Sequence, residues 1–290
     1  MNRSKLLRLA AVGAAAAMVL TACGDDNGTD DPTDGSTDAG SDIQRIVDAG
    51  RMVVGVKFDQ PTFGLDTPDG VVGFDVEIAN LIAAALGDGI EVEFVEAVSA
   101  NREPFIQNGT VDIVVATYTI NDTRDEVIDF AGPYYVAGQD IMVPAGNPDN
   151  ITGIESVDTA DLTGCSVDGS TSIENLTTMA PNADTITFDT YSKCADEMAL
   201  GGADYVTTDN VILVGLIADS DGAYELVNNP FTTEPYGIGV PEGSDLRCQI
   251  NEILADIYAS GEWAAAYDAT VGQVSGGAAP APPELNNEGC

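Results

Sequence analysis

From residue 51 onward, hydrophobic and polar positions predict strands that alternate with helices. The segment 51–57, RMVVGVK, is apolar nearly throughout, which is typical of a strand buried on both faces of its sheet. The segment 74–87, FDVEIANLIAAALG, has apolar residues at helical spacing and predicts a helix with Asp75 as its N-cap and Gly87 at its end. A strand, a short helix and another strand follow, at 90–97, 101–109 and 110–119. This order implies an α/β lobe with a mainly parallel sheet.

A second series of predicted elements begins near residue 140. Its strands are expected at 141–145, 164–169, 184–191 and 203–209, and its helices at 170–179 and 195–201. The last predicted elements are too few for a lobe of their own and would complete the first lobe; they lie at 236–241, 246–261 and 262–272. Because 290 residues exceed a typical single core, we predict two α/β lobes joined by two crossings of the chain. Lobe 1 is expected at 43–138 and 233–274, and lobe 2 at 139–232.

Two segments have a composition that cannot bury a core. Residues 24–42 are all Gly, Asp, Thr, Ser, Asn, Pro or Ala, so we predict a flexible, self-repelling acidic tether over 23–42. The Pro/Ala/Gly-rich segment 275–290 is similar in kind but less charged. We expect it to form an unstructured C-terminal tail.

The N-terminus has the pattern of an export signal. Basic residues in the first eight positions precede the apolar run 9–20, which is too short to span a bilayer comfortably. The run ends in LTAC, residues 20–23, which resembles a bacterial lipobox, in which Cys23 would be lipidated after removal of a signal peptide at 1–22. The alternative is an ordinary signal peptide followed by a chance cysteine. With two or more acyl chains on Cys23, we expect an extracytoplasmic protein anchored firmly to the outer face of the cell membrane.

The other four cysteines suit an oxidising compartment, where disulfides persist. They allow three connectivities, of which we favour Cys165 with Cys194 and Cys248 with Cys290. The first bond would link a strand to the next helical segment, and the second would hold the C-terminal tail. A zinc site is the competing interpretation, but the chain has no C-x-x-C motif and no histidine. We therefore expect neither a metal nor a cofactor.

The charge balance makes each basic residue informative. The chain has 48 acidic and 10 basic residues and a net charge of −38, which argues against binding to nucleic acid or to anionic lipid through surface charge. We interpret the acidity itself as a solvated surface. Seven basic residues remain after the N-terminal signal: Arg45, Arg51, Lys57, Arg102, Arg124, Lys193 and Arg247.

Several polar residues stand where a ligand of an α/β sheet binds, beyond the carboxyl ends of the strands. Those that follow a predicted strand, or open the helix before one, are Lys57, Arg102, Thr117, Thr119, Arg124, Ser170, Thr171 and Asp209. The helix that starts near Ser170 also offers free backbone N–H groups to an anion. Three cations, several hydroxyls and one acid match a zwitterion that bears a second negative charge.

Four stretches carry a resemblance to a known family: GFDVEIANLIAAALG, NREPFIQNGTVDIVVATYTINDTR, DFAGPYY and ADYVTTDNVIL. Together they resemble the bacterial polar-amino-acid binding proteins, the solute-binding components of ATP-driven importers. The likeness spans about 43–272, and CSVDGSTS and DTYSKC make it closest to the glutamate-binding lipoproteins of actinobacteria. It implies the type II periplasmic-binding-protein fold, an α/β fold in which two lobes, joined by a two-strand hinge, enclose a ligand cleft.

The resemblance also implies roles for individual residues. Arg124 matches the arginine that binds the substrate α-carboxylate, Thr117 and Thr119 match the hydroxyl pair beside it, and Asp209 matches the acid that accepts the α-ammonium group. The remaining matches are Ser170 and Thr171 for the loop of lobe 2 that reaches the ligand, Lys57 and Arg102 for the cations that bind a side-chain carboxylate, and Phe58 and Tyr118 for apolar walls.

Each charged residue also has a purely structural alternative. These are ion pairs of Arg124 with Asp122 or Asp125, of Arg102 with Glu103 and of Lys57 with Asp59, and a helix N-cap formed by Asp209. With the family pattern, we expect ligand contact in all four cases.

We therefore predict a substrate-binding lipoprotein of an ABC importer that captures glutamate and delivers it to a membrane permease and its ATPase subunits. It is expected to be a monomer and not an enzyme. Without histidine there is no Ser–His–Asp chemistry of the usual form, and no P-loop motif occurs. The alternatives are glutamine, aspartate or another polar amino acid as ligand, an extracytoplasmic enzyme of the same fold such as a dehydratase, and a ligand-sensing module.

Overall fold

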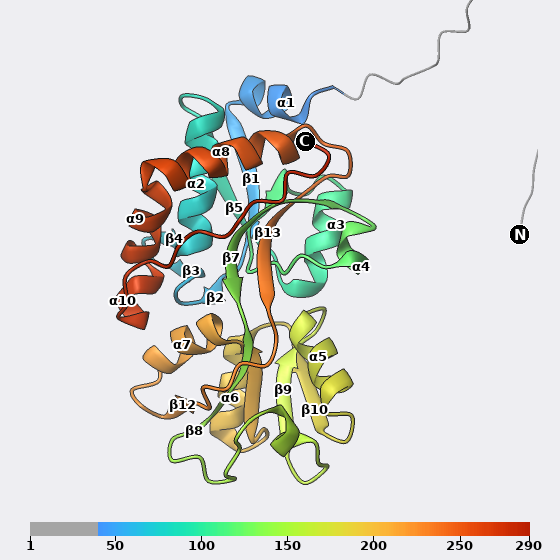
Figure 1. Cartoon of the computed structure of the whole chain (residues 1–290), viewed down its shortest axis with the longest axis vertical. Helices are drawn as coiled ribbons and strands as arrows, with labels where there is room; N and C mark the ends of the chain where they lie inside the picture. Colours follow the sequence, from blue (N-terminus) through green and yellow to red (C-terminus); the bar gives the residue numbers. More distant parts are fainter. Residues whose placement is uncertain (1–39) are drawn as a thin grey trace, which may run out of the picture. The chain divides into compact units, whose positions relative to one another are not determined.

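The computed structural model describes residues 40–290. The expected signal peptide, Cys23 and most of the expected tether lie outside these residues. Within them, two five-stranded sheets form the cores of two α/β lobes, in the orders β5-β1-β6-β13-β7 and β10-β9-β11-β8-β12 (Figure 1). The α/β architecture with two lobes is confirmed. In the described part of the chain, no helix combines the length and apolarity needed to span a bilayer.

Lobe 1 consists of the first sheet and the elements around it. These are α1 (Asp42–Ala49), β1 (Arg51–Val56), β2 (Asp59–Gln60), β3 (Gly64–Thr67), β4 (Gly70–Val72), α2 (Phe74–Leu86), β5 (Glu91–Glu96), η1 (Ser99–Asn101), α3 (Arg102–Gln107), β6 (Ile113–Val114), α4 (Asp122–Asp125), β7 (Asp129–Ala137), β13 (Glu234–Val240), α8 (Leu246–Ser260), α9 (Glu262–Ala269) and α10 (Val271–Ser275). β1 pairs in parallel with β5 and β6, whereas β13 enters from the C-terminal part of the chain and runs antiparallel to β6 and β7.

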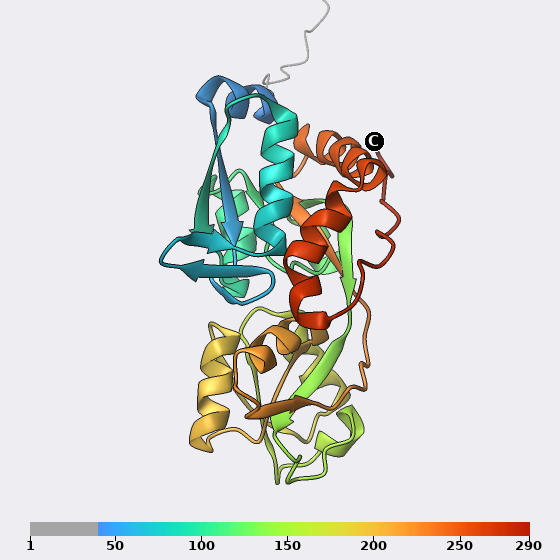
Figure 2. The ribbon, with the colours of Figure 1, turned by 90° about the vertical axis from the view of Figure 1, so that its left-hand side faces the viewer.

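Lobe 2 consists of the second sheet and its helices. These are β8 (Gln139–Pro144), η2 (Ile154–Val157), β9 (Thr163–Val167), α5 (Thr171–Met179), β10 (Asp184–Phe188), α6 (Tyr191–Leu200), β11 (Tyr205–Asp209), α7 (Asn210–Ala218) and β12 (Tyr224–Leu226). β9 pairs in parallel with β10 and β11, and β8 is antiparallel to β11 and β12. The chain crosses between the sheets after β7 and again before β13, and both connections are visible in Figure 2. We keep 138/139 and 232/233 as our proposed lobe boundaries.

An aromatic cluster fills the core of lobe 1 beside the strand that leaves for lobe 2. The rings of Phe74 and Trp263 meet edge to face with centroids 5.6 Å apart, and Trp263 stacks on Tyr267. The indole Nε1 of Trp263 donates to the backbone carbonyl of Tyr134 on β7 at 2.9 Å. This bond satisfies the one polar atom of the buried indole.

Two disulfides are present within residues 40–290, with the pairing favoured from the sequence. Cys165–Cys194 joins β9 to α6 inside the core of lobe 2, and Cys248–Cys290 joins α8 to the C-terminal tail. Each closes its loop and so lowers the conformational entropy of the unfolded chain.

The C-terminal tail corrects an expectation, because it is not loose. It contains no helix or strand beyond α10, but Asn286 N donates to Gly132 O on β7 and Asn251 Nδ2 donates to Asn286 O. Leu285 also packs against the lobe 1 core. Prolines stiffen the segment and so reduce the entropy lost when it becomes ordered, and the disulfide holds its end. The composition of the segment alone therefore gave the wrong prediction of an unstructured tail.

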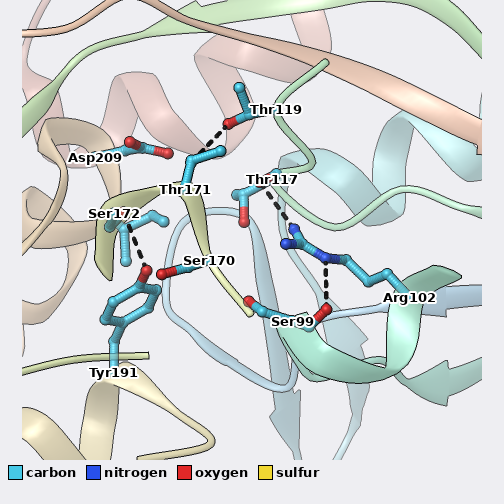
Figure 3. A pocket seen from close by; sticks show the side chains of 10 residues that line it. Ser99, Arg102, Thr117, Thr119, Ser170, Thr171, Ser172, Tyr191 and Asp209 are labelled. Carbon is cyan, nitrogen blue, oxygen red and sulfur yellow. Dashed lines mark hydrogen bonds between the residues drawn. The ribbon is translucent and has the colours of Figure 1, made fainter. Parts of the chain in front are cut away.

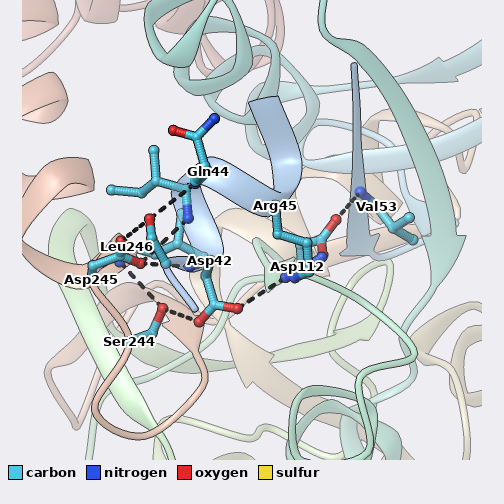
Figure 4. A network of polar contacts seen from close by, with 10 residues as sticks. Asp42, Gln44, Arg45, Val53, Asp112, Ser244, Asp245 and Leu246 are labelled. Carbon is cyan, nitrogen blue, oxygen red and sulfur yellow. Dashed lines mark hydrogen bonds and ion pairs between the residues drawn. The ribbon is translucent and has the colours of Figure 1, made fainter. Parts of the chain in front are cut away.

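The expected tether also ends earlier than predicted, because Asp42 already belongs to α1. Ser41 caps this helix by accepting from Gln44 N, and the Asp245 carboxylate accepts from Asp42 N at 3.0 Å (Figure 4). Arg45, on the same helix, bonds to Asp112 at 2.6 Å. These bonds to residues more than sixty positions away fix α1 on lobe 1, which local composition cannot reveal.

Two local predictions were wrong, and one set of strands was missed. Gly73, not Asp75, precedes α2 as its N-cap, and Asp75 is buried instead. The strand predicted at 110–119 is reduced to β6, because Thr117 has a left-handed φ of 44° and turns the chain out of the sheet. The three-stranded meander β2–β3–β4 between β1 and α2 was not predicted.

Candidate ligand-binding site between the lobes

A small polar pocket lies where the two lobes meet. It is lined by Ser99, Arg102, Thr117 and Thr119 from lobe 1 and by Ser170, Thr171, Ser172, Tyr191, Asp209 and Ile212 from lobe 2 (Figure 3). The cavity is about 10 Å³, which is close to the space that one water molecule requires. An amino acid therefore enters only if the lobes move apart. Of the ten predicted ligand-binding residues, the structure brings six to this pocket: Arg102, Thr117, Thr119, Ser170, Thr171 and Asp209.

Several of the lining residues stand at strand ends, where ligands of an α/β sheet bind. Thr117 and Thr119 follow β6, and Ser170 follows β9 as the N-cap of α5, where its Oγ accepts from Ile173 N. Asp209 is the last residue of β11. In Figure 3 these side chains converge from both lobes on the same space.

Arg102 is the best-defined cation of the pocket. Its side chain is 2% exposed, its Nε donates to Ser99 O at 3.2 Å and its Nη1 donates to Ala116 O at 3.2 Å. Burial and the nearby Arg124 guanidinium lower the Arg102 pKa to about 10. Among the described residues Arg102 has no ion-pair partner, so the alternative pair with Glu103 is not formed.

Arg124 lies next to the pocket and is 7% exposed. Its Nη1 donates to Thr119 O at 2.7 Å, and its Nε pairs at 3.2 Å with Glu103, rather than with the neighbouring acids Asp122 and Asp125. Arg124 therefore does form an ion pair, as the structural alternative had it, but its partner is Glu103 instead of Asp122 or Asp125.

The two arginines share a partner on lobe 2. Arg102 Nη2 and Arg124 Nη2 both donate to Gly169 O, at 3.4 and 3.2 Å. Gly169 has a φ of +72°, and a Cβ there would lie 2.8 Å from the Ala100 Cα, so only glycine permits this close approach between the lobes. The Gly169 carbonyl oxygen thus occupies a position where an anion could accept hydrogen bonds from both guanidinium groups.

Tyr118 supports these cations instead of forming an apolar wall. Its buried ring lies under both guanidinium groups, with the Cζ atoms of Arg102 and Arg124 at 4.2 and 4.9 Å from the ring centroid. Cation–π contact stabilises charge at a site without water. Phe58, the other predicted wall, does not reach the pocket, because it packs on the lobe 1 core.

Lys57 is a third buried cation behind the pocket wall. It is 3% exposed, and its Nζ donates to Ser99 Oγ at 2.8 Å. Burial, and then the charge of Arg102, lower the Lys57 pKa to about 7. Within residues 40–290 no carboxylate lies within ion-pair distance of Lys57, so the alternative pair with Asp59 is not formed.

Asp209 presents a free acceptor in the pocket. It is 3% exposed, and its Oδ2 accepts from Tyr236 OH at 2.6 Å, while Oδ1 has no hydrogen-bond partner among the described residues. It stands at the N-cap position of α7 without making a side-chain cap bond, so the capping alternative is not formed. Burial, and then the charge of Glu234, raise the Asp209 pKa to about 7. A buried carboxylate oxygen without a donor is suited to an ammonium group.

A further buried carboxylate, Asp75, positions the hydroxyl loop. Its Oδ2 accepts from Thr117 N at 2.8 Å, and Tyr134 OH donates to its Oδ1 at 2.5 Å. Burial raises the Asp75 pKa to about 7. These bonds hold Thr117 in its left-handed backbone conformation, which is strained for a β-branched residue.

Four lining residues were missed from the sequence: Ser99, Ser172, Tyr191 and Ile212. Ser99 follows β5, and Tyr191, whose OH donates to Ser172 Oγ at 3.3 Å, follows β10. The strand-end rule could have found these two if it had been applied to every strand. Ile212 lies on α7 and carries no comparable signal.

Comparison with known proteins gives one family. The model of the bacterial extracellular solute-binding proteins, family 3, matches residues 52–273. The chain is 35% identical to the glutamate-binding protein GluB of Corynebacterium efficiens, over 90% of each chain. It is 36% identical to the ABC transporter glutamine-binding protein GlnH of Bacillus subtilis, over 89% of this chain and 94% of that protein.

Solved structures lead to the same family. An ancestral arginine-binding protein bound to glutamine superimposes with a TM-score of 0.71 at 32% identity, over 76% of this chain and 97% of that one. Each of these three relatives is named as a binding protein. The described part of the chain has the type II periplasmic-binding-protein fold, and the chain belongs to the bacterial extracellular solute-binding proteins, family 3.

Proposed function

We propose that this amino-acid receptor of an ABC importer captures glutamate. The observation that carries the proposal is the set of buried charges in and beside the pocket: Lys57, Arg102 and Arg124 are buried there, and of the three only Arg124 has a carboxylate, that of Glu103, at ion-pair distance among the described residues. Asp209 Oδ1 has no donor among these residues. The ammonium group of a zwitterion would pair with Asp209 and its carboxylate with Arg124, which leaves Lys57 and Arg102 for a second carboxylate.

Each group has a definite task in this mechanism. Arg124, with Thr117 and Thr119, binds the α-carboxylate through parallel charge-assisted bonds, and Asp209 accepts the α-ammonium group. Lys57 and Arg102 bind the side-chain carboxylate. Ser170 and Thr171 complete the site from lobe 2. On ligand binding, the Nη2 groups of Arg102 and Arg124 that now donate to Gly169 O would donate to the ligand carboxylates instead.

Selectivity follows from the cost of unpaired buried charge. Removing one partner of such a pair costs roughly 3–5 kcal/mol, or a factor of about a few hundred to a few thousand in affinity. Glutamine has no side-chain charge for Lys57 and Arg102 and would be disfavoured. A permease with its ATPase subunits would then recognise the closed, liganded form.

The cellular context is part of the proposal. We infer that residues 1–22 are a signal peptide and that lipidated Cys23 anchors the protein to the outer face of the cell membrane. The mature protein would act as a monomer without enzymatic activity and without nucleic-acid partners.

Calorimetry of residues 40–290 with the twenty common amino acids tests the ligand. We expect glutamate to bind most tightly, Arg124→Ala to abolish binding, and Arg51→Gln, which removes an exposed arginine paired with Glu93, to bind as the parent does. Equal affinity of the parent for glutamate and glutamine would reject the side-chain assignment.

The second candidate ligand is glutamine, favoured by the relationship to GlnH. Aspartate is a further candidate, because it has the same charged groups as glutamate on a shorter side chain. An enzyme of the same fold, such as a dehydratase, remains the rival from another class. Incubation with glutamate followed by mass spectrometry distinguishes it, because a binding protein releases its ligand unaltered.

A further inference from the structure

The β2–β3–β4 meander is a fixed part of lobe 1 that reaches lobe 2. Phe63, between β2 and β3, lies in the lobe 1 core, with its ring 5.8 Å from that of Phe74. On the other side, Thr62 Oγ1 donates to Val211 O on α7 at 3.5 Å, and a Cβ on Gly215 would lie 3.4 Å from Pro61. The meander therefore links the lobe 1 core to the helices of lobe 2.

The helix α6 of lobe 2 does not cap its own N-terminus. The N-cap residue, Thr190, has the extended backbone usual for a cap, with φ −136° and ψ 153°, but its side chain makes no cap hydrogen bond. Instead, Asp59 Oδ2, on β2 of lobe 1, accepts from Tyr191 N at 2.9 Å and from Ser192 N at 3.4 Å. The first N–H groups of a helix require acceptors, and a carboxylate there also interacts favourably with the helix dipole.

The capped helix is firmly joined to the binding site. Cys194 on α6 is bonded to Cys165 on β9, and β9 leads into the loop with Gly169. Tyr191, whose backbone N–H is capped, also lines the pocket. Asp59 itself is not among the lining residues and would not touch a ligand.

We propose that Asp59 is a closure latch, which caps α6 only while the lobes are together. Separation of the lobes withdraws the carboxylate and leaves the α6 N-terminus to water. The cap therefore stabilises the closed form and raises ligand affinity, although Asp59 does not touch the ligand. This inference rests on the proposed hinged capture, and it assigns a positioning role to a residue outside the pocket.

The charge of Asp59 has a second effect that the experiment must separate. Asp59 favours the charged form of Lys57, against the burial that lowers the Lys57 pKa. Two substitutions divide the effects, because alanine removes both the acceptor and the charge, whereas asparagine removes the charge but keeps a side-chain oxygen that can accept from the α6 N–H groups.

The test measures affinity and dissociation rates for glutamate and glutamine by calorimetry and stopped flow. Loss of a cap corresponds to about 2- to 30-fold in an equilibrium constant. We expect Asp59→Ala to weaken glutamine by a factor in this range, through faster dissociation, and glutamate by at least as much, whereas Asp59→Asn should keep glutamine near the parent and reduce only the affinity for glutamate. The matched control is Asp66→Ala, an exposed aspartate on the same meander.

A second variant separates closure from helix stability. In Asp59→Ala/Thr190→Asp the helix receives a cap from its own lobe, so thermal stability is expected to return while affinity stays low. The latch is refuted if Asp59→Ala binds as the parent does, if Asp59→Asn binds glutamine as weakly as Asp59→Ala, or if the added cap restores affinity.

The latch can be judged even if the parent binds neither amino acid, an outcome that would reject the proposed ligand. Amide exchange of Tyr191 and Ser192 is then followed by NMR with and without whichever of the twenty common amino acids calorimetry finds to bind. Protection that the parent gains with this amino acid, lost in Asp59→Ala and kept in Asp59→Asn, supports the latch, and an unchanged gain in Asp59→Ala overturns it.

Discussion

The two lobes bring opposite chemistry to the pocket between them. Lobe 1 contributes cations whose pKa is lowered first by burial and then by one another, as Arg124 does for Arg102 and Arg102 does for Lys57. Lobe 2 contributes hydroxyls, the N-terminus of α5 and the Asp209 carboxylate. Within lobe 1 only Arg124 of these cations has a carboxylate at ion-pair distance, that of Glu103, so an anion would relieve the repulsion that remains between Arg102 and Lys57. This asymmetry suits capture followed by closure.

After the loss of binding expected for Arg124→Ala, the largest effect is expected from removing the acid of lobe 2. Asp209→Asn should weaken glutamate binding by a few hundred- to a few thousandfold, because the α-ammonium group loses its charged partner. Calorimetry at pH 7 measures this loss. A variant that retains the parent affinity would remove Asp209 from the site.

The same substitution should stabilise the protein without ligand. Because the pKa of Asp209 is raised to about 7 from 3.8, its ionisation opposes folding above about pH 4, and the penalty is complete above pH 7. Asp209→Asn should therefore raise Tm by about 2–4 °C per kcal/mol of penalty removed at pH 8, with no gain at pH 4. Scanning calorimetry at both pH values checks the sign.

Next in size is the change of selectivity from lobe 1. Arg102→Gln should reduce the preference for glutamate over glutamine by about 10- to 100-fold, because the side-chain carboxylate loses one charge-assisted partner. Competition binding with both amino acids gives the ratio. An unchanged ratio would leave Lys57 as the determinant of selectivity.

The pH profile sharpens the comparison, since each lobe has one group with a pKa of about 7. Below pH 7 Asp209 becomes protonated, and affinity should fall up to tenfold per pH unit for either amino acid. Above pH 7 Lys57 becomes neutral, and affinity should fall similarly for glutamate only. A bell-shaped profile for glutamate and a one-sided profile for glutamine are expected, and identical profiles would contradict the role of Lys57.

The smallest effect on binding is expected far from the pocket. Cys248→Ser/Cys290→Ser removes the bond that holds the tail and should lower the free energy of unfolding by about 2–4 kcal/mol. Affinity should change less than twofold, because the tail contacts α8 and β7 but lines no part of the pocket. Denaturant titration and calorimetry measure the two quantities separately.

The alternation of strands and helices along the chain and the residues at several strand ends were largely predictable, because buried parallel strands are apolar runs and their carboxyl ends lie at one edge. Asp209 was found in this way, and Arg102 because it opens the helix before a predicted strand. Long-range partners were not predictable: Asp75 has the local pattern of a helix cap, but the tertiary structure directs it to Thr117 and Tyr134. Phe58 packs on the lobe 1 core and does not line the pocket in this structure, a packing that a residue-by-residue match does not reveal, and its contact with a ligand stays a prediction.

The hydrogen bond from Trp263 to Tyr134 has a practical consequence. Trp263 is the one tryptophan of the chain, and its indole is attached to the strand whose continuation leads into lobe 2. A bend of β7 during opening would alter the polarity and hydrogen bonding that set the indole emission wavelength. The protein thus carries its own optical reporter of hinge movement, and fluorescence can follow it without a dye.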